Sequence, residues 1–139
     1  MRLPKEKLGG VCWLARFVDK ARAFAAGTLP EEYLARFCDP RGMDGGFLSF
    51  FQLDKENTLA AIVESAGDDD RLAEWFRRQP SVTAEKIERW NCVAPDFGRR
   101  GHPGFRTFQW AMKHVYPHAP YSGVESLFEV IETDEANAK

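Results

Sequence analysis

The sequence is poor in the features that mark disulfide-rich, zinc-binding or membrane proteins. Its three cysteines, Cys12, Cys38 and Cys92, are isolated and form no C-x-x-C pair, which argues against a disulfide scaffold and a structural zinc site. No apolar run approaches the roughly 20 residues of a membrane span. Basic residues precede the apolar segment 8–15, as in a signal peptide, but its glycines and the charge of Arg16 break that pattern. We therefore expect a cytoplasmic protein that does not bind membranes.

The sequence also lacks a large excess of charge of either sign. The chain has 19 Lys and Arg against 21 Asp and Glu, a formal net charge of -2, whereas dedicated nucleic-acid binders are usually basic. Neither an H-E-x-x-H pair nor a G-x-S-x-G element is present. We therefore expect no nucleic-acid partner, no metal and no other cofactor. The 139 residues, 44% of them hydrophobic and 29% charged, suit one globular domain.

Helical periodicity runs through most of the chain, and alternating strand patterns are lacking. Short apolar segments with three- and four-residue spacing are separated by Gly and Pro. The sequence therefore predicts an all-α fold, a compact bundle of about six or seven short helices in a single domain over residues 1–139. Within it we expect an irregular loop over 94–104, C-terminal helices over 104–132 and a frayed acidic tail over 133–139.

Start signals mark several of the expected helices. Asp54 is placed as the N-cap of one helix, and Ser81 or Thr83 as the N-cap of another. The run Asp68-Asp69-Asp70 offers three carboxylates that could be taken for metal ligands. Because the run follows Gly67 and precedes an apolar helix pattern, capping and helix-dipole interaction are favoured.

The stretch from Leu8 to Gly27 has the clearest helical pattern, and we expect the rest of the domain to pack around it. Gly9 and Gly10 mark its entry and Gly27 its end. At roughly 100° per residue its apolar side chains share one side. They are Val11, Trp13, Leu14, Phe17, Val18, Ala21, Phe24 and Ala25. We expect this whole face, Phe24 included, to lie in the core.

The opposite face of this helix carries Arg16, Asp19, Lys20 and Arg22. Asp19 lies three residues from both Arg16 and Arg22 and is spaced to pair with them, whereas Lys20 has no acidic partner in the helix. Three cations against one acid suit the recognition of a phosphate or carboxylate. The alternative is that these charges pair with acids on neighbouring helices and fix their packing.

Aromatic and polar residues could complete such a site at its edges. Trp13 lies beside Lys20 on the helical wheel, which leaves a cation–π contact or a ligand shelf open. Trp90 and Asn91 place an aromatic ring beside an amide, although Trp90 also suits the core and Asn91 a helix C-cap. Tyr33 is a further edge residue on an expected short helix.

Four segments of the chain together resemble a bacterial family catalogued as a domain of unknown function, DUF5069. They are LGGVCWLARFVDKARAFAAGTL, LDKENTLAAIV, DDDRLAEWF and EKIERWN. The matching positions are Leu8-Gly9-Gly10, Arg16, Asp19-Lys20, Arg22, Tyr33 and Trp90-Asn91. The resemblance covers most of residues 4–92, with a weaker echo over 128–135, while residues 38–46 and 94–104 look particular to this chain. It implies an all-helical cytoplasmic domain and brings no activity.

Two weaker candidates lie elsewhere. Cys12 falls in the first turn of the expected helix, where a helix dipole would lower its pKa, but the histidines lie far away in sequence and a structural thiol is favoured. Arg99, Arg100 and His102 precede an expected helix N-terminus, a position that suits anions. The alternative for these three residues is a mobile surface loop.

These observations favour a binding or interaction module over an enzyme. The hypothesised ligand site comprises Trp13, Arg16, Asp19, Lys20, Arg22, Tyr33, Trp90 and Asn91. A small anion or a protein would be the partner. One alternative is a small enzyme acting on an anionic metabolite, with Asp19 as the base in a concave pocket beside Lys20. The other alternative is that the charged set of this helix is purely structural.

Overall fold

The computed structural model describes residues 1–117 and 123–137, and within them the fold is mostly helical. The α-helices are α1 (Leu14–Ala25), α2 (Glu31–Leu34), α3 (Met43–Phe50), α4 (Lys55–Glu64), α5 (Asp69–Arg78), α6 (Ala84–Val93), α7 (Phe105–His114) and α8 (Leu127–Asn137). A 3-10 helix, η1 (Ala94–Asp96), and a two-stranded sheet of β1 (Lys7–Leu8) and β2 (Val11–Cys12) complete the described elements. The predicted all-α class is therefore confirmed.

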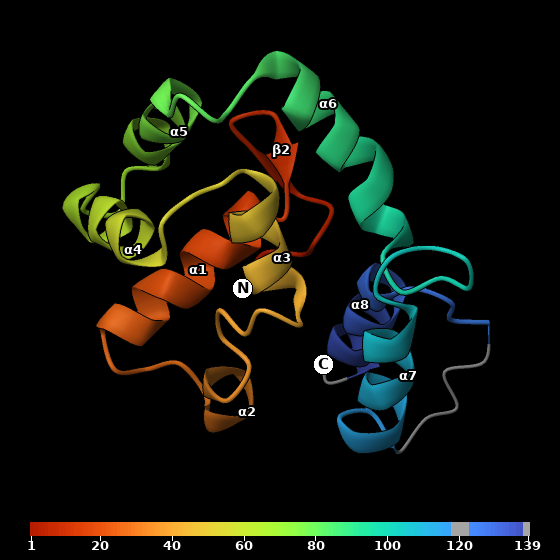
Figure 1. The fold of residues 1–139 in the computed structure, drawn as a ribbon. Helices are drawn as coiled ribbons and strands as arrows, with labels where there is room; N and C mark the ends of the chain where they lie inside the picture. Colours follow the sequence, from red (N-terminus) through yellow and green to blue (C-terminus); the bar gives the residue numbers. More distant parts are fainter. Residues whose placement is uncertain (118–122, 138–139) are drawn as a thin grey trace.

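Helix α1 lies near the middle of the molecule. In Figure 1, α4 and α5 lie at one side and α7 and α8 at the other, with α1 between them. Helix α1 packs against α4 and β1, α6 packs against β2, and η1 packs against α8. The helices of the two ends of the chain are thereby held around one shared core.

The first helix begins later than the sequence predicts. Residues 7–12 form an antiparallel hairpin in which Leu8 pairs with Val11. Its turn consists of Gly9 and Gly10 with φ of 62° and 83°, and two consecutive positive φ angles in a two-residue turn strongly favour glycine. The glycine pair therefore marks a hairpin turn and not a helix entry, and Cys12 lies in a strand.

The core is built largely from aromatic side chains. Most of the apolar face expected on α1 is buried, but Phe24 is 46% exposed and Ala25 is exposed as well, so the placement of these two residues in the core was wrong. A helical wheel shows which side of a helix is apolar, but it does not show how far along the helix other elements pack against that side. Phe24 lies in the last turn of α1. Phe47, Phe51 and Phe76 form the main cluster, with ring centroids 5.0 to 5.8 Å apart.

Three helices in the middle of the chain have the expected caps. The carboxylate of Asp54 accepts a hydrogen bond from the backbone N–H of Asn57, and the hydroxyl of Thr83 accepts one from the backbone N–H of Lys86. The carboxylate of Asp68 accepts the amides of Asp70 and Arg71, which confirms that the aspartate run caps a helix. Within the described residues no group of three or more His, Cys, Asp or Glu could hold a metal ion. None of the described helices is long and apolar enough to cross a membrane.

The acidic tail is helical up to Asn137, whereas the sequence predicts a frayed tail from residue 133. Helix α8 continues to Asn137, while residues 138 and 139 lie outside the described part. Phe128 at its start is buried and stacks on Trp13 with centroids 5.7 Å apart. Farther along, Glu135 pairs with Arg16 at 2.7 Å. Apolar packing and neutralised acids together hold the helix in place.

Candidate functional site

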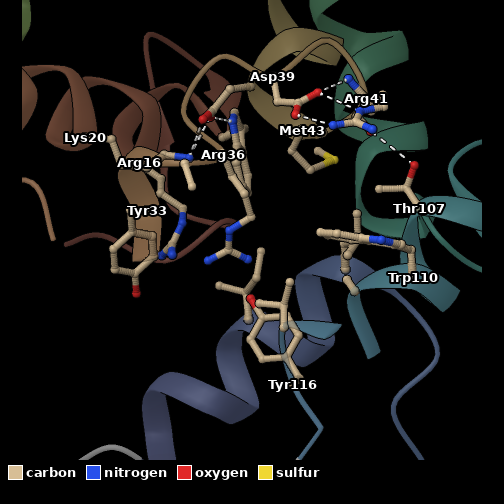
Figure 2. Close-up of a pocket in the computed structure, with 18 of the residues that line it drawn as sticks. Arg16, Lys20, Tyr33, Arg36, Asp39, Arg41, Met43, Thr107, Trp110 and Tyr116 are labelled. Carbon is tan, nitrogen blue, oxygen red and sulfur yellow. Dashed lines mark hydrogen bonds and ion pairs between the residues drawn. The ribbon is translucent and has the colours of Figure 1, made fainter. Parts of the chain in front are cut away.

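A cavity of about 450 Å³ opens between α1, the segment from α2 to the start of α3, α7 and α8. Figure 2 shows Arg16, Lys20 and Tyr33 on one side of this space and Trp110 on the other. Among the described lining residues, five are cationic and two are acidic. The cations are Arg16, Lys20, Arg36, Arg41 and Arg106, and the acids are Asp39 and Asp44.

Lys20 and Asp44 form a buried ion pair in the cavity wall. The Lys20 Nζ atom donates to both carboxylate oxygens, at 2.6 and 2.7 Å. The Trp13 indole N–H donates to the same carboxylate at 3.0 Å, and the backbone N–H of Cys38 donates at 3.3 Å. Burial lowers the pKa of Lys20, and the adjacent carboxylate of Asp44 offsets only part of that effect. The Nζ atom also lies 4.7 Å from the centroid of the Trp13 ring, a cation–π contact.

Local structure explains the position of Asp44. It lies in the first turn of α3, where the helix dipole favours a carboxylate. The next residue is Gly45, and a Cβ atom there would lie 2.3 Å from the Asp39 carbonyl oxygen. Glycine therefore lets the loop before α3 pack closely over the helix start. This close approach brings Asp39 and Asp44 to the same cavity.

Arg16 is a buried cation in the same wall, with only 2% of its surface exposed. Its guanidinium donates to the Arg2 carbonyl oxygen at 3.2 Å and pairs with Glu135 at 2.7 Å. It also lies 5.8 Å from the ring centroids of both Trp13 and Tyr33. Its Nε–H is buried and has no hydrogen-bond partner among the described residues. A buried cation that retains an unused donor lines the cavity.

Three further arginines line the cavity. Arg41 pairs with Asp39 at 3.0 Å, and its carbonyl oxygen accepts the Thr107 hydroxyl at 3.1 Å, which links this loop to α7 (Figure 2). Arg36 lies 5.9 Å from the Tyr33 ring centroid. Arg106 is exposed and forms no hydrogen bond or ion pair within residues 1–117 and 123–137. Its guanidinium group is therefore available to a ligand.

Most of the remaining lining is apolar or aromatic. It includes Trp13, Met43, Trp110, Ala111, Val115, Tyr116, Leu127 and Ile131, with Tyr33 beside Arg16. Burial raises the pKa of both Tyr33 and Tyr116, so their hydroxyls stay neutral near pH 7. Trp110 is 52% exposed, an unusual position for a large aromatic side chain. The cavity thus combines an apolar surface with an excess of positive charge.

The structure brings together half of the eight residues expected from the sequence. Trp13, Arg16, Lys20 and Tyr33 line the cavity, whereas Asp19, Arg22, Trp90 and Asn91 do not. The charged face of α1 is therefore not one continuous site. It divides into residues that face the cavity and residues that bind the N-terminus and α5.

Asp19 and Arg22 belong to a separate ion-pair network. Asp19 accepts the backbone N–H of Arg2 at 2.7 Å and pairs with its guanidinium at 2.8 Å, so the expected pairing with Arg16 and Arg22 was wrong. Arg22 pairs instead with Asp69 at 2.7 Å, and Arg2 contacts the same carboxylate. Although burial acts in the opposite direction, the hydrogen bonds from Arg2 and Arg22 lower the pKa of Asp69.

Trp90 and Asn91 form hydrogen bonds to the hairpin and do not line the cavity. The Trp90 indole donates to the Cys12 carbonyl oxygen at 3.0 Å. The Asn91 amide accepts the Cys12 N–H at 2.9 Å and donates to the Gly10 carbonyl oxygen at 2.9 Å. Asn91 lies inside α6, so it is not a C-cap either. Burial raises the pKa of Cys12 to about 11, opposite to the shift expected for a thiol in a first helical turn.

The loop that carries Arg99, Arg100 and His102 is held in place by ion pairs of Arg99. Arg99 pairs with Asp96 at 2.7 Å, with Glu125 at 2.9 Å and with Glu129 at the start of α8. Its charge is thereby neutralised, while Arg100 and His102 are exposed. This loop does not line the cavity.

Sequence patterns gave no sign of most of the cavity. Arg36, Asp44 and Arg106 come from three separate segments, and Trp110 follows Arg106 by one helical turn on α7. Only the tertiary fold unites these three segments. Asp44 sits before the Gly45-Gly46 pair, a context that indicates a flexible link and not a buried charge. The one signal in the sequence was Trp110, a large aromatic residue that lies off the apolar face of its helix and is exposed in the structure.

Comparison with known proteins gives a family and no activity. A search of curated proteins found no sequence that matches this chain. The family profile described as a domain of unknown function, DUF5069, matches residues 1–137. The match therefore extends beyond residues 4–92 and includes the segments 38–46 and 94–104, together with every residue that lines the cavity. The chain belongs to the DUF5069 family.

Proposed function

We propose that this protein binds a small anionic molecule with an apolar body in the cavity between α1, α3, α7 and α8. The observation that carries the proposal is the charge of the lining, five cations against two acids, in a chain whose formal net charge is -2. A cavity of about 450 Å³ lies in the range of small-molecule sites. A protein partner is less well supported, because it would favour a flatter apolar patch.

Two kinds of side chain in the lining would contact the ligand, namely arginines and apolar residues. Arg36 and Arg106 offer planar guanidinium groups, which bind carboxylate and phosphate with two parallel hydrogen bonds. Trp110, Tyr116 and Ile131 offer an apolar surface for the rest of the ligand. The ligand expected from this arrangement has an acidic group joined to an aromatic or aliphatic body.

The alternative of an enzyme with Asp19 as its base loses support. Asp19 does not line the cavity, and its carboxylate is held by Arg2. The structural alternative describes Asp19 and Arg22 well, because both are engaged in ion pairs. It does not account for Arg106, which has no partner in the described part of the chain.

We also propose that the protein works in the cytoplasm. Cys12, Cys38 and Cys92 are all free thiols, and unpaired cysteines are typical of reducing compartments. Fractionation of the native host cell checks this proposal. Recovery of the protein outside the cytoplasm would contradict it.

Binding can be tested by thermal shift and by tryptophan fluorescence. The probes are 4-phenylbutyrate and phenyl phosphate, with the uncharged 4-phenylbutanol as their control. Trp110 lines the cavity, so bound probe should change the fluorescence of the wild type and much less that of Trp110→Phe. We expect at least one anionic probe to raise the melting temperature and the uncharged probe to have little effect.

The variants for this test are Arg106→Gln and Arg36→Gln. Lys20→Ala is unsuitable, because it would leave the Asp44 carboxylate buried without its partner. Loss of one charge-assisted contact should weaken anion binding by about tenfold or more. Arg89→Gln is the matched control, because Arg89 is exposed on α6 and does not line the cavity. Equal weakening in all three variants, or no binding of either anion, would overturn the proposal.

A further inference from the structure

We infer that Lys20 is a nucleophilic amine that forms an imine with an anionic aldehyde or ketone held in the cavity. This inference rests on the proposed function, because the same cavity has to bind the anionic group of the substrate. It adds a reaction and a substrate class to that function. The substrate would be an oxo acid or a phosphorylated carbonyl compound.

The geometry places an amine, a proton carrier and cations around one cavity. Lys20 lines the cavity and is only 6% exposed, so its amine lies in an environment with little water. Asp44 lies 2.6 Å from the amine and lines the same space. Arg36 and Arg106 supply positive charge for the anionic group. Figure 2 shows Lys20 and Arg36 bordering the same space.

The surroundings of Lys20 favour release of its proton. Burial disfavours the ammonium form, and the positive charge of Arg16 acts in the same direction. Hydrogen bonds from the Trp13 indole and the Cys38 backbone N–H hold the Asp44 carboxylate in place. Inside such a buried pair the proton can pass to the carboxylate without crossing bulk water, and desolvated lysines are the usual source of Schiff-base amines.

The step balances without any co-reactant. The Lys20 ammonium gives a proton to Asp44, the freed nitrogen lone pair adds to the carbonyl carbon, and the protonated Asp44 carboxyl returns that proton to the carbonyl oxygen. Asp44 then takes a second proton from the nitrogen of the carbinolamine and gives it to the hydroxyl, which leaves as water while the protonated C=N bond forms. One C=O bond and two N–H bonds are replaced by one C=N bond and one molecule of water.

The test is reductive trapping with 4-carboxybenzaldehyde and sodium cyanoborohydride. Intact mass and peptide mapping identify which of the seven lysines carries the adduct. We expect Lys20 to be modified about tenfold or more faster than the exposed Lys55 and Lys113, because binding raises the local concentration of the carbonyl. The competitor 4-methylbenzoate, an anion without the carbonyl, should slow labelling of Lys20 only.

A variant and a binding measurement separate this inference from the proposed function. Lys20→Arg keeps a cation beside Asp44, and it should still be stabilised by 4-methylbenzoate while losing the fast adduct. If 4-methylbenzoate binds the wild type but Lys20 reacts no faster than surface lysines, the imine is ruled out and anion binding stands. If neither compound binds, both proposals are wrong. Should Lys20→Arg fail to fold, peptide mapping of the wild type decides alone.

Discussion

Lys20 on α1 and Asp44 on α3 are joined by contacts of 2.6 and 2.7 Å although they lie 24 residues apart in the sequence. Both residues are buried, at 6% and 4% exposed. Moving two charges out of water is unfavourable unless they are paired and hydrogen-bonded. The hydrogen bonds from Trp13 and from the Cys38 backbone meet that requirement on the carboxylate side. The pair therefore joins two helices at the wall of the cavity.

The pair should be strongly non-additive in its effect on stability. Asp44→Leu and Lys20→Met each leave a buried charge without a partner, and each should lower the free energy of unfolding by about 3–5 kcal/mol. The double variant should lose far less than the sum of the two, as measured by denaturant unfolding. Glu74→Gln, in an exposed ion pair with Arg78, is the control and should cost less than about 1 kcal/mol. Additive losses would show that the two residues act independently.

The tail of α8 should contribute to stability through Glu135. Its carboxylate is the ion-pair partner of the buried Arg16, so Glu135→Gln should lower the free energy of unfolding by about 1–3 kcal/mol. Glu88→Gln is the matched control, because Glu88 is exposed on α6, and its effect should stay within about 0.5 kcal/mol. Equal and small effects of both substitutions would mean that the tail adds nothing, as the sequence had led us to expect.

The three thiols should differ in reactivity. Cys92 is exposed, whereas burial raises the pKa of Cys12 and of Cys38 to about 11. At pH 8 a thiol with so high a pKa holds very little thiolate, the reactive form. We expect a disulfide reagent to label one thiol quickly in the folded protein and all three after unfolding. Rapid labelling that persists in Cys92→Ser would contradict the burial of the other two.

Acid should weaken the network of Arg2, Arg22 and Asp69. The pKa of Asp69 is lower in the folded protein than in the unfolded chain, so the unfolded chain binds more protons as the pH falls past the ordinary aspartate value of about 3.9. The stability from Asp69 is therefore present above that pH and is lost below it. Because the side chain of Asp69 is 37% exposed, its share should be about 1 kcal/mol or less.

The variant Asp69→Asn checks this pH dependence by thermal unfolding between pH 7 and pH 3. It should unfold at a lower temperature than the wild type at pH 7, and the difference should shrink toward pH 3. Asp70→Asn is the control, because Asp70 is exposed and does not form an ion pair within residues 1–117 and 123–137. A difference that stays constant with pH would rule out this role for Asp69.

The sequence predicted those parts of the site that depend on one helix. Four of the eight expected residues line the cavity, and Lys20 does lie over the Trp13 ring. Asp19 was misplaced because its spacing allowed pairs within α1, whereas Arg2 folds back and takes the carboxylate. The pocket residues on α7 and α8 could not be found in this way. They meet α1 only when distant parts of the chain pack together.

By itself the sequence determined the all-α class, the helix caps and most of the buried face of α1. These features depend on contacts within about four residues, and local spacing therefore determines them. Only the tertiary structure decided that Gly9 and Gly10 form a hairpin turn, that Phe24 is exposed and that α8 extends to Asn137. It also decided which charges meet, because an ion pair such as Arg16 with Glu135 joins opposite ends of the chain. The spacing of neighbouring residues cannot predict such a contact, because the two charges meet only when the whole core packs.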